Sequence, residues 1–200
     1  MSMNIVKIGF IALLFSLVSC AEKQQILDIS GNWEVSLDSM NSFQPIQLPG
    51  TTDMAGLGVA NELEPALKKP QLLHLTRKHA YIGQAWYKRT VLIPEHMANR
   101  PLTLTLERVL WQSRLWIDGV KHSAEEESLT TPHQYYIAEG LKAGEHEFLL
   151  CIDNRKRYDI STGELAHAYT EDTQVKWNGV LGKMELKAET KLKIHQIDAY

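Results

Sequence analysis

The 200-residue chain is long enough for one domain with a sizeable core, and a second domain would have to be small. Its hydrophobic content of 44% and charged content of 22% are those of an ordinary folded protein. A formal net charge of -3 provides no long-range attraction for nucleic acid or for an anionic membrane surface. We therefore expect no nucleic-acid partner.

The N-terminus has the features of an export signal. The apolar run from Ile8 to Val18 is too short for the ~20 residues that span a bilayer, and it has the length of a signal-peptide core. It closes in Leu17-Val18-Ser19-Cys20, which resembles a bacterial lipobox. The resemblance implies cleavage before Cys20, a lipid anchor on its sulfur, and a location in the cell envelope, at the outer membrane or facing the periplasm. An ordinary secretory peptide is the alternative.

The mature chain has the pattern of an all-β domain. Apolar residues alternate in 33–38, 102–107 and 115–118, which predicts three half-buried strands. A turn or two of helix is expected over 62–68. Predicted turns lie at Leu48-Pro49-Gly50, Ile93-Pro94-Glu95, Asp118-Gly119 and Ala143-Gly144-Glu145. Their spacing is typical of a two-sheet sandwich, with a predicted core of Trp33, Trp86, Leu104, Trp116, Phe148, Leu150 and Ile152.

Four further features have mainly structural interpretations. Cys151 lies among apolar residues and is expected to be a small buried hydrophobe. Two interpretations of Trp111 stay open, a packed ring on a bulged strand or a rim ring that faces a ligand. Glu125-Glu126-Glu127 is expected to be a solvated turn, and Arg155-Lys156-Arg157 a solvated loop.

Residues 167–182 alternate polar and aromatic side chains with neither a helical nor a strand period. Such a segment is typical of a binding loop held by a rigid scaffold. Its Tyr, Trp, Asn, Gln and Asp side chains are those that bind a sugar, by ring stacking and by hydrogen bonds to hydroxyls. Asn178-Gly179 near its end predicts a turn.

Several short blocks carry a resemblance to one known domain. The first half of the chain contains Gly31-Asn32-Trp33, Leu48 to Asp53, His74 to Arg77 and Ala85 to Arg89. The second half contains Leu115 to Gly119, Thr131-Pro132-His133, Asp153-Asn154 and Trp177 to Gly182. In the order and spacing of these blocks, the chain resembles the N-terminal sugar-binding domain of family 2 glycoside hydrolases, the β-galactosidase and β-glucuronidase group.

The resemblance implies a galactose-binding-like jelly roll. In that family an immunoglobulin-like domain and a (β/α)8 barrel follow, and the barrel carries the two catalytic glutamates of a retaining mechanism. We expect a signal peptide over 1–19, a tether over 20–28, the sandwich over 29–190 and the start of a following domain over 191–200. Because the barrel is missing from this chain, we expect hydrolysis of O-glycosyl bonds only with a barrel domain or subunit as a partner.

The resemblance also implies a sugar site, since loops of the first domain contact the terminal sugar in such enzymes. The matching positions here predict the substrate-binding residues His74, Arg77, Asp172, Gln174, Trp177 and Asn178. Asp172 and Gln174 would bind hydroxyls, Trp177 would stack on a sugar face, and His74 would hydrogen-bond through a ring nitrogen. A structural ion pair for Arg77 and packing of Trp177 against the sandwich are the alternatives.

Structural interpretations are favoured for the other candidate residues. Asp53, Asn154 and His167 fall on matching blocks, and an Asx-turn, a strand-ending turn and an interior histidine are favoured for them. Glu171 and Asp172 are adjacent, so on a strand they would point to opposite faces and would not flank one glycosidic bond. The sequence therefore predicts no catalytic pair.

No cofactor or metal is expected. The sequence contains no zinc motif, phosphate loop or dinucleotide fingerprint. Asp153, Asn154 and Asp159 offer oxygen ligands, but they lack the spacing of a known calcium loop.

Three classes of function stay open. The favoured one is the carbohydrate-binding domain of a β-galactosidase-like hydrolase that needs its barrel. The second is a stand-alone carbohydrate-binding lipoprotein at the cell surface, and the third is a protein-docking scaffold.

Overall fold

A computed structural model describes residues 25–62, 64, 67–68, 78–158 and 176–189. Within these residues the chain forms thirteen strands and one short 3-10 helix, η1 (Glu95–Met97). The strands of the first half are β1 (Ile26–Asp28), β2 (Gly31–Ser36), β3 (Gln44–Leu48), β4 (Gly50–Thr51), β5 (Val59–Ala60), β6 (His79–Ala80) and β7 (Gln84–Ile93). Those of the second half are β8 (Leu102–Val109), β9 (Gln112–Ile117), β10 (Val120–Glu127), β11 (His133–Ile137), β12 (Gly144–Asp153) and β13 (Gly179–Ala188).

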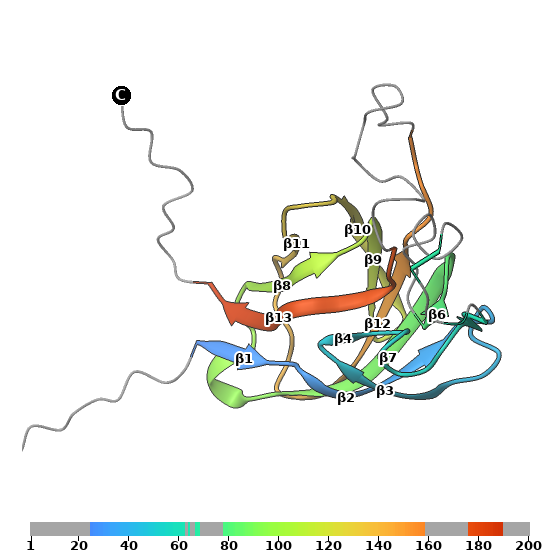
Figure 1. Cartoon of the computed structure of the whole chain (residues 1–200). Coiled ribbons are helices and arrows are strands. Elements are labelled where there is room, and N and C mark those ends of the chain that lie inside the picture. Colours follow the sequence, from blue (N-terminus) through green and yellow to red (C-terminus); the bar gives the residue numbers. More distant parts are fainter. Residues whose placement is uncertain (1–24, 63, 65–66, 69–77, 159–175, 190–200) are drawn as a thin grey trace, which may run out of the picture.

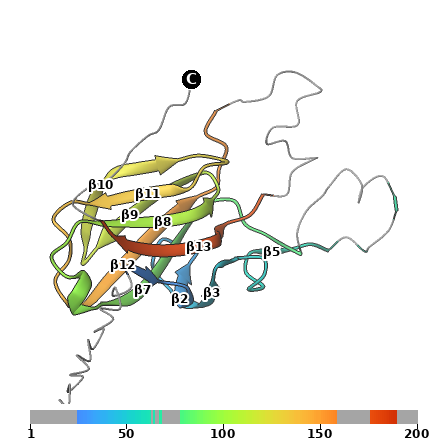
Figure 2. The ribbon, with the colours of Figure 1, turned by 90° about the vertical axis from the view of Figure 1, so that its left-hand side faces the viewer.

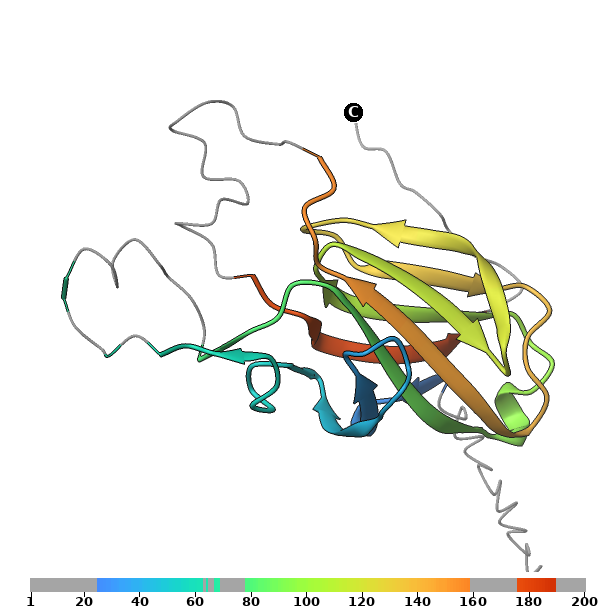
Figure 3. The ribbon, with the colours of Figure 1, turned by 90° about the vertical axis from the view of Figure 1, so that its right-hand side faces the viewer.

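The strands form two packed antiparallel sheets (Figure 1). The five-stranded sheet has the order β1-β13-β8-β11, and β4 pairs with the start of β13. The six-stranded sheet has the order β10-β9-β12-β7-β2-β3, and Figure 3 shows its central strands β12 and β7 side by side. This arrangement confirms the predicted all-β jelly-roll sandwich. The described residues contain no helix that is long and apolar enough to cross a membrane.

The core lies between the two sheets. Each strand alternates, so one set of side chains faces the other sheet and the next set faces outward. Five of the seven predicted core residues lie there and are buried: Trp33, Leu104, Phe148, Leu150 and Ile152. Burial of each such side chain contributes about 1.5–3 kcal/mol to the free energy of unfolding.

The prediction is wrong for the other two residues, Trp86 and Trp116, which do not lie in the core. Ala85 and Tyr87 point into the core from β7, so Trp86 between them points out of the sandwich, and Trp116 does the same on β9. The two indole rings meet above β12, with centroids 5.2 Å apart. The sequence shows the period of a strand, but which of its faces is buried depends on the partner sheet.

Cys151 is fully buried, as predicted, although it does not belong to the core. Leu150 and Ile152 occupy the core side of β12, which leaves Cys151 on the outer face, in register with Trp86 on β7. On its other side β9 places Arg114 in register with Cys151, and the Arg114 guanidinium donates to the Cys151 sulfur over 3.2 Å.

Three of the predicted strands are present, as β2, β8 and β9, and the Asp118-Gly119 turn joins β9 to β10. The solvated turn predicted at Glu125-Glu126-Glu127 is wrong, because these residues form the end of β10 and pair with Gln112 to Arg114 on β9. Charged edge strands of this kind resist pairing with other chains. The first strand, β1, begins inside the range 20–28 that was expected to be a tether.

The turn predicted at Asn178-Gly179 is also wrong. Gly179 is the first residue of β13, where it pairs with Thr51, and no turn forms there. The glycine is needed for a different reason: its φ is +139°, and a Cβ atom would lie 2.2 Å from the carbonyl oxygen of Gly50.

One end of the sandwich gathers several segments that are distant in sequence (Figures 2 and 3). The ribbon of β5 and β6 projects from it, and the chain leaves and re-enters the described residues there, at Tyr158 and Lys176. We call it the loop end; η1 lies at the opposite end.

Candidate functional site

The structure describes two of the six predicted sugar-binding residues, Trp177 and Asn178, which directly precede β13 and are hydrogen-bonded to Asn154 and Gly83, respectively. Predicted residues outside the described ranges are His74, Arg77, Asp172 and Gln174, together with Cys20, Asp159, His167 and Glu171.

Trp177 is partly buried and packs against a small cluster separate from the main core. The cluster is formed by Leu110 and Trp111, and Leu129 also packs against it. Trp111, the residue left open between packing and a ligand-facing rim, is only 3% exposed and is therefore a packed ring. Trp177 therefore packs on this cluster while the residue keeps part of its surface exposed.

A cavity of about 360 Å³ lies beside this cluster. It is lined by Arg155, Lys156, Arg157 and Tyr158. The Tyr158 ring stands edge-on to Trp111, with ring centroids 6.0 Å apart, and is 57% exposed. An exposed aromatic ring beside long polar side chains is suited to a saccharide, because the ring can stack and the charged groups can hydrogen-bond hydroxyls.

The charges around the cavity are largely paired. Arg155 Nε donates to Asp153 Oδ1 over 2.8 Å, and Arg157 Nε lies 3.8 Å from Glu127 Oε2. Burial raises the pKa of the Asp153 carboxyl, but the hydrogen bonds from Arg155 outweigh burial and bring that pKa down to about 2. Burial lowers the pKa of the Lys176 amine. Asp153 is thus a fixed anion that orients Arg155, which makes it unsuited to act as a proton donor.

Asn154 joins three segments at this end of the sandwich. Its Oδ1 accepts the Gly83 N–H over 2.9 Å, and its Nδ2 donates to the carbonyl oxygens of Tyr81 (2.8 Å) and Trp177 (3.0 Å). The residue does follow the last residue of β12, as predicted, but its fully buried side chain reaches far beyond a local turn.

Asn178 makes a similar set of contacts and is also fully buried. The Tyr87 hydroxyl donates to its Oδ1 over 2.7 Å, and its Nδ2 donates to the carbonyl oxygens of Gly83 (3.1 Å) and Ile152 (3.2 Å). Because the side chain has no exposed surface, its burial argues against the direct sugar contact that the sequence predicted. We call Asn154 and Asn178, with these hydrogen bonds, the asparagine clamp.

Sequence reasoning missed the tyrosines that complete this end. Tyr81 contributes its carbonyl oxygen to the clamp and donates its hydroxyl to the Gln84 carbonyl oxygen over 2.7 Å. Tyr87 contributes its hydroxyl, and Tyr158 the exposed ring. Of the three, only Tyr87 lies in one of the segments that carry the family resemblance, and there the core position was assigned to its neighbour Trp86. Asp53, another candidate, accepts the backbone N–H of His79 over 2.7 Å, a contact across 26 residues.

A second polar cluster lies inside the sandwich. Ser113 Oγ is 2.6 Å from His133 Nδ1 and 2.7 Å from the Tyr135 hydroxyl, and it connects the two sheets. A serine beside a histidine is a possible nucleophile and base in general terms. All three side chains here are 0% exposed, so no substrate reaches them and their role is structural.

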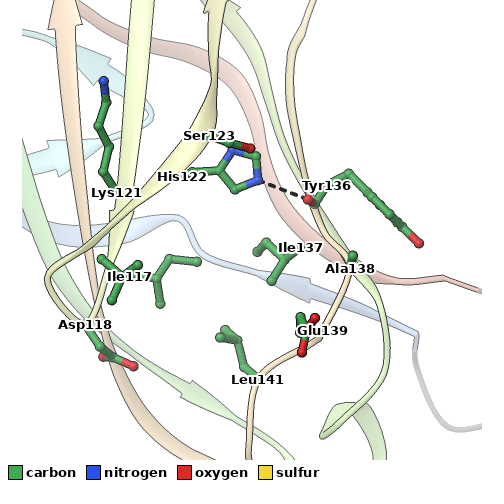
Figure 4. Close-up of a pocket in the computed structure, with 11 residues that line it drawn as sticks. Ile117, Asp118, Lys121, His122, Ser123, Tyr136, Ile137, Ala138, Glu139 and Leu141 are labelled. Carbon is green, nitrogen blue, oxygen red and sulfur yellow. Dashed lines mark hydrogen bonds between the residues drawn. The ribbon is translucent and has the colours of Figure 1, made fainter.

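A further cavity, of about 450 Å³, lies at the open edge between β9, β10 and β11 (Figure 4). The His122 ring crosses this edge, because its Nδ1 accepts the Ala124 N–H and its Nε2 donates to the Tyr136 carbonyl oxygen. Figure 4 shows the Tyr136 ring directed away from the cavity. The ring that remains beside the cavity is the His122 imidazole, which is smaller than a tyrosine or tryptophan ring, and the loop end is therefore the better candidate for a sugar.

Among the described residues, no group of three or more His, Cys, Asp or Glu side chains is placed to hold a metal ion.

No protein-family model matches this chain, and no curated protein sequence does. Solved structures of β-glucuronidases do share its fold. The enzyme from Ruminococcus gnavus, in complex with uronic deoxynojirimycin, matches 84% of this chain with a TM-score of 0.58 and 12% identity. Those from Dictyoglomus thermophilum and Faecalibacterium prausnitzii each match 83% with a TM-score of 0.55, at 14% and 17% identity.

The match covers only part of each enzyme. This chain spans 29% of the Ruminococcus gnavus chain, 28% of the Dictyoglomus thermophilum chain and 31% of the Faecalibacterium prausnitzii chain. At these identities the similarity shows a shared fold, that of one β-sandwich domain within a larger enzyme.

Proposed function

We propose that this chain is the sugar-contacting β-sandwich domain of a family 2-type glycoside hydrolase. The observation that carries the proposal is the match of most of this chain to less than a third of several β-glucuronidases. The aromatic surface and cavity at the loop end support a saccharide as the ligand. In this proposal the domain takes part in the hydrolysis of O-glycosyl bonds only when a catalytic barrel, as a further domain or a subunit, supplies the two carboxylates.

The proposed location is the cell envelope. Cys20, which follows the lipobox-like residues, would carry a lipid anchor after cleavage. Radiolabelled palmitate should be incorporated by cells that express the chain and not by cells that express Cys20→Ser. Equal labelling of both would refute the anchor.

Reconstitution tests the enzymatic proposal. The chain would be assayed with 4-nitrophenyl β-D-glucuronide and 4-nitrophenyl β-D-galactoside, alone and with a family 2 barrel supplied as a second polypeptide. We expect hydrolysis only in the mixture, at a rate above that of the barrel alone. A barrel whose rate does not change on addition of the folded chain would count against the proposal.

A stand-alone carbohydrate-binding lipoprotein is the second candidate, favoured by the partly exposed Trp177 and the open cavity. Calorimetry with a panel of glycosides decides between the two. Binding that is saturable, lost in Trp177→Ala and kept in Trp86→Ala would favour this candidate. The Trp86→Ala control removes an indole of equal size from the outer face of the six-stranded sheet. A folded chain without affinity would leave the enzyme domain favoured over the stand-alone module.

A further inference from the structure

The asparagine clamp joins segments that are far apart in sequence and adjacent at the loop end. Asn154 connects the end of β12 to the carbonyl oxygen of Trp177, and Asn178 connects the start of β13 to the carbonyl oxygen of Ile152. Both asparagines also bond Gly83, one through its N–H and the other through its carbonyl oxygen. Of the two peptide groups that flank Gly83, one is thus bonded by Asn154 and the other by Asn178.

These hydrogen bonds hold backbone atoms that are adjacent in the chain to the residues of the candidate sugar site. Trp177 is held through its own carbonyl oxygen, and Arg155, the first residue of the cavity, directly follows Asn154. The clamp side chains are 0% exposed and do not reach the cavity surface themselves. Their effect on a ligand can only be exerted through the residues that they position.

A purely structural role would not need this arrangement. A buried asparagine that only ties strands together can do so anywhere along the sandwich. Here Asn154 immediately precedes the segment that ends in the exposed ring of Tyr158, and Asn178 immediately follows Trp177. Because ligand affinity depends on sub-ångström placement of such groups, a rigid base next to them has a direct consequence for binding.

We propose that Asn154 and Asn178 are positioning residues of the sugar site, which fix the backbone of Trp177 relative to the segment from Arg155 to Tyr158 so that a saccharide meets one preformed surface. The inference rests on the proposed function, since it names the residues that hold the proposed site in shape. Neither asparagine touches the sugar.

The test compares sugar affinity in variants that stay folded. Asn154→Ala removes the side chain that bonds Trp177. Tyr87→Phe is a milder change, because it removes one hydrogen bond to Asn178 and leaves the ring in the core. The matched control is Thr103→Val, which removes a nearly buried hydroxyl that bonds Glu189 at the far end of β8. All variants would be made in the full chain with Cys20→Ser, to avoid lipidation.

Dissociation constants for methyl β-D-glucuronide and methyl β-D-galactoside would be measured by NMR titration, at a temperature at which circular dichroism shows each variant to be fully folded. We expect affinity to fall about tenfold in Asn154→Ala, less in Tyr87→Phe, and to stay within about twofold of wild type in Thr103→Val. Wild-type affinity in a folded Asn154→Ala chain would overturn the proposal. An equal loss in Thr103→Val would overturn it as well, because the effect would then be one of general stability.

A wild-type chain that binds neither glycoside would be a failure of sugar binding by the domain alone, and a ligand-free measurement then decides the role of the clamp. Nuclear Overhauser contacts between the Trp177 indole and Leu110 should be present in wild type and in Thr103→Val, and should be lost in Asn154→Ala. Contacts that persist in Asn154→Ala would show that the clamp does not position Trp177, and would overturn the proposal.

Discussion

The Tyr87 hydroxyl donates a 2.7 Å hydrogen bond to Asn178 Oδ1 in the buried interior, across a sequence separation of 91 residues. The bond links β7 of the six-stranded sheet to the residue before β13 of the five-stranded sheet. It thereby couples the packing of the two layers to the geometry of the loop end.

Replacement of Asn178 should be costly for stability. Asn178→Ala removes the partner of the Tyr87 hydroxyl and of the carbonyl oxygens of Gly83 and Ile152. Because buried polar groups that lose their partners each carry a desolvation cost, we expect the free energy of unfolding to fall by about 3 kcal/mol. Urea unfolding followed by tryptophan fluorescence measures it. The exposed Asn41→Ala should change stability by less than about 0.5 kcal/mol, and equal losses in the two variants would contradict this account.

Gly179 should not tolerate even a methyl group. In Gly179→Ala the new Cβ would lie 2.2 Å from the Gly50 carbonyl oxygen and 2.9 Å from Thr51 Cα, both of them backbone atoms of the paired strand. We expect the variant to lose more than about 2 kcal/mol, or to fail to fold. Gly144→Ala is the matched control, because its φ of +121° is similar and nothing lies within 4 Å of the new Cβ. Thermal unfolding that shifts equally in both would show backbone strain, and not the close approach, to be the cause.

Stability should fall on mild acidification because of His133. Burial lowers its pKa from the ordinary value of 6.5, and this effect exceeds the opposite influence of Glu126 and Glu127. The unfolded chain therefore takes up a proton at a higher pH than the folded chain, so this contribution to stability declines as the pH falls below about 6.5, with a slope of up to about 1.4 kcal/mol per pH unit.

The measurement for His133 is the free energy of unfolding between pH 7.5 and pH 5. His133→Gln keeps a polar side chain near Ser113 and removes the titrating group, so its stability should depend less steeply on pH than that of the wild type. Parallel curves for the two proteins would assign the acid sensitivity to other groups.

Cys151 should react with thiol reagents only when its neighbour Trp86 is removed. Burial raises the pKa of its thiol, an effect larger than the lowering by nearby Arg114, and the side chain is 0% exposed. In a Cys20→Ser chain at pH 8, modification by a disulfide reagent should be slow, and Trp86→Ala should accelerate it by about tenfold or more because the indole in register with Cys151 is lost. Leu92→Ala, at an exposed position of β7, serves as the control. Rapid reaction of the native chain would contradict the burial of this thiol.

The strands themselves were predictable because their signal is local. Alternation in Leu102 to Glu107 reflects a strand with one face buried, whatever its neighbours are. Which face of the sheet Trp86 and Trp116 occupy was not predictable, because their rings are as apolar as those of core residues. One face of β7 and β9 is covered by the other sheet, and the opposite face carries the tryptophan pair.

The sugar site expected within residues 167–182 stays a prediction, because the structure describes that segment only from Lys176 onward. Near the end of that segment, Trp177 packs against Leu110 and Trp111 and is partly buried. Asn178 was expected to contact a sugar because an amide in such a run is a good ligand for hydroxyls. Its burial depends on Tyr87, Gly83 and Ile152, which lie 26 to 95 residues away, and no local pattern encodes contacts of that range.

What the sequence determined by itself was the all-β class, the positions of several strands and the segment where polar and aromatic side chains gather, because each rests on residues within a few positions of one another. Only the tertiary structure decided which face of each strand is buried, which glycine must have no side chain and which asparagines hold the loop end together. Those properties depend on the register of two sheets and on atoms that meet across long sequence separations, so they exist only once the chain has folded.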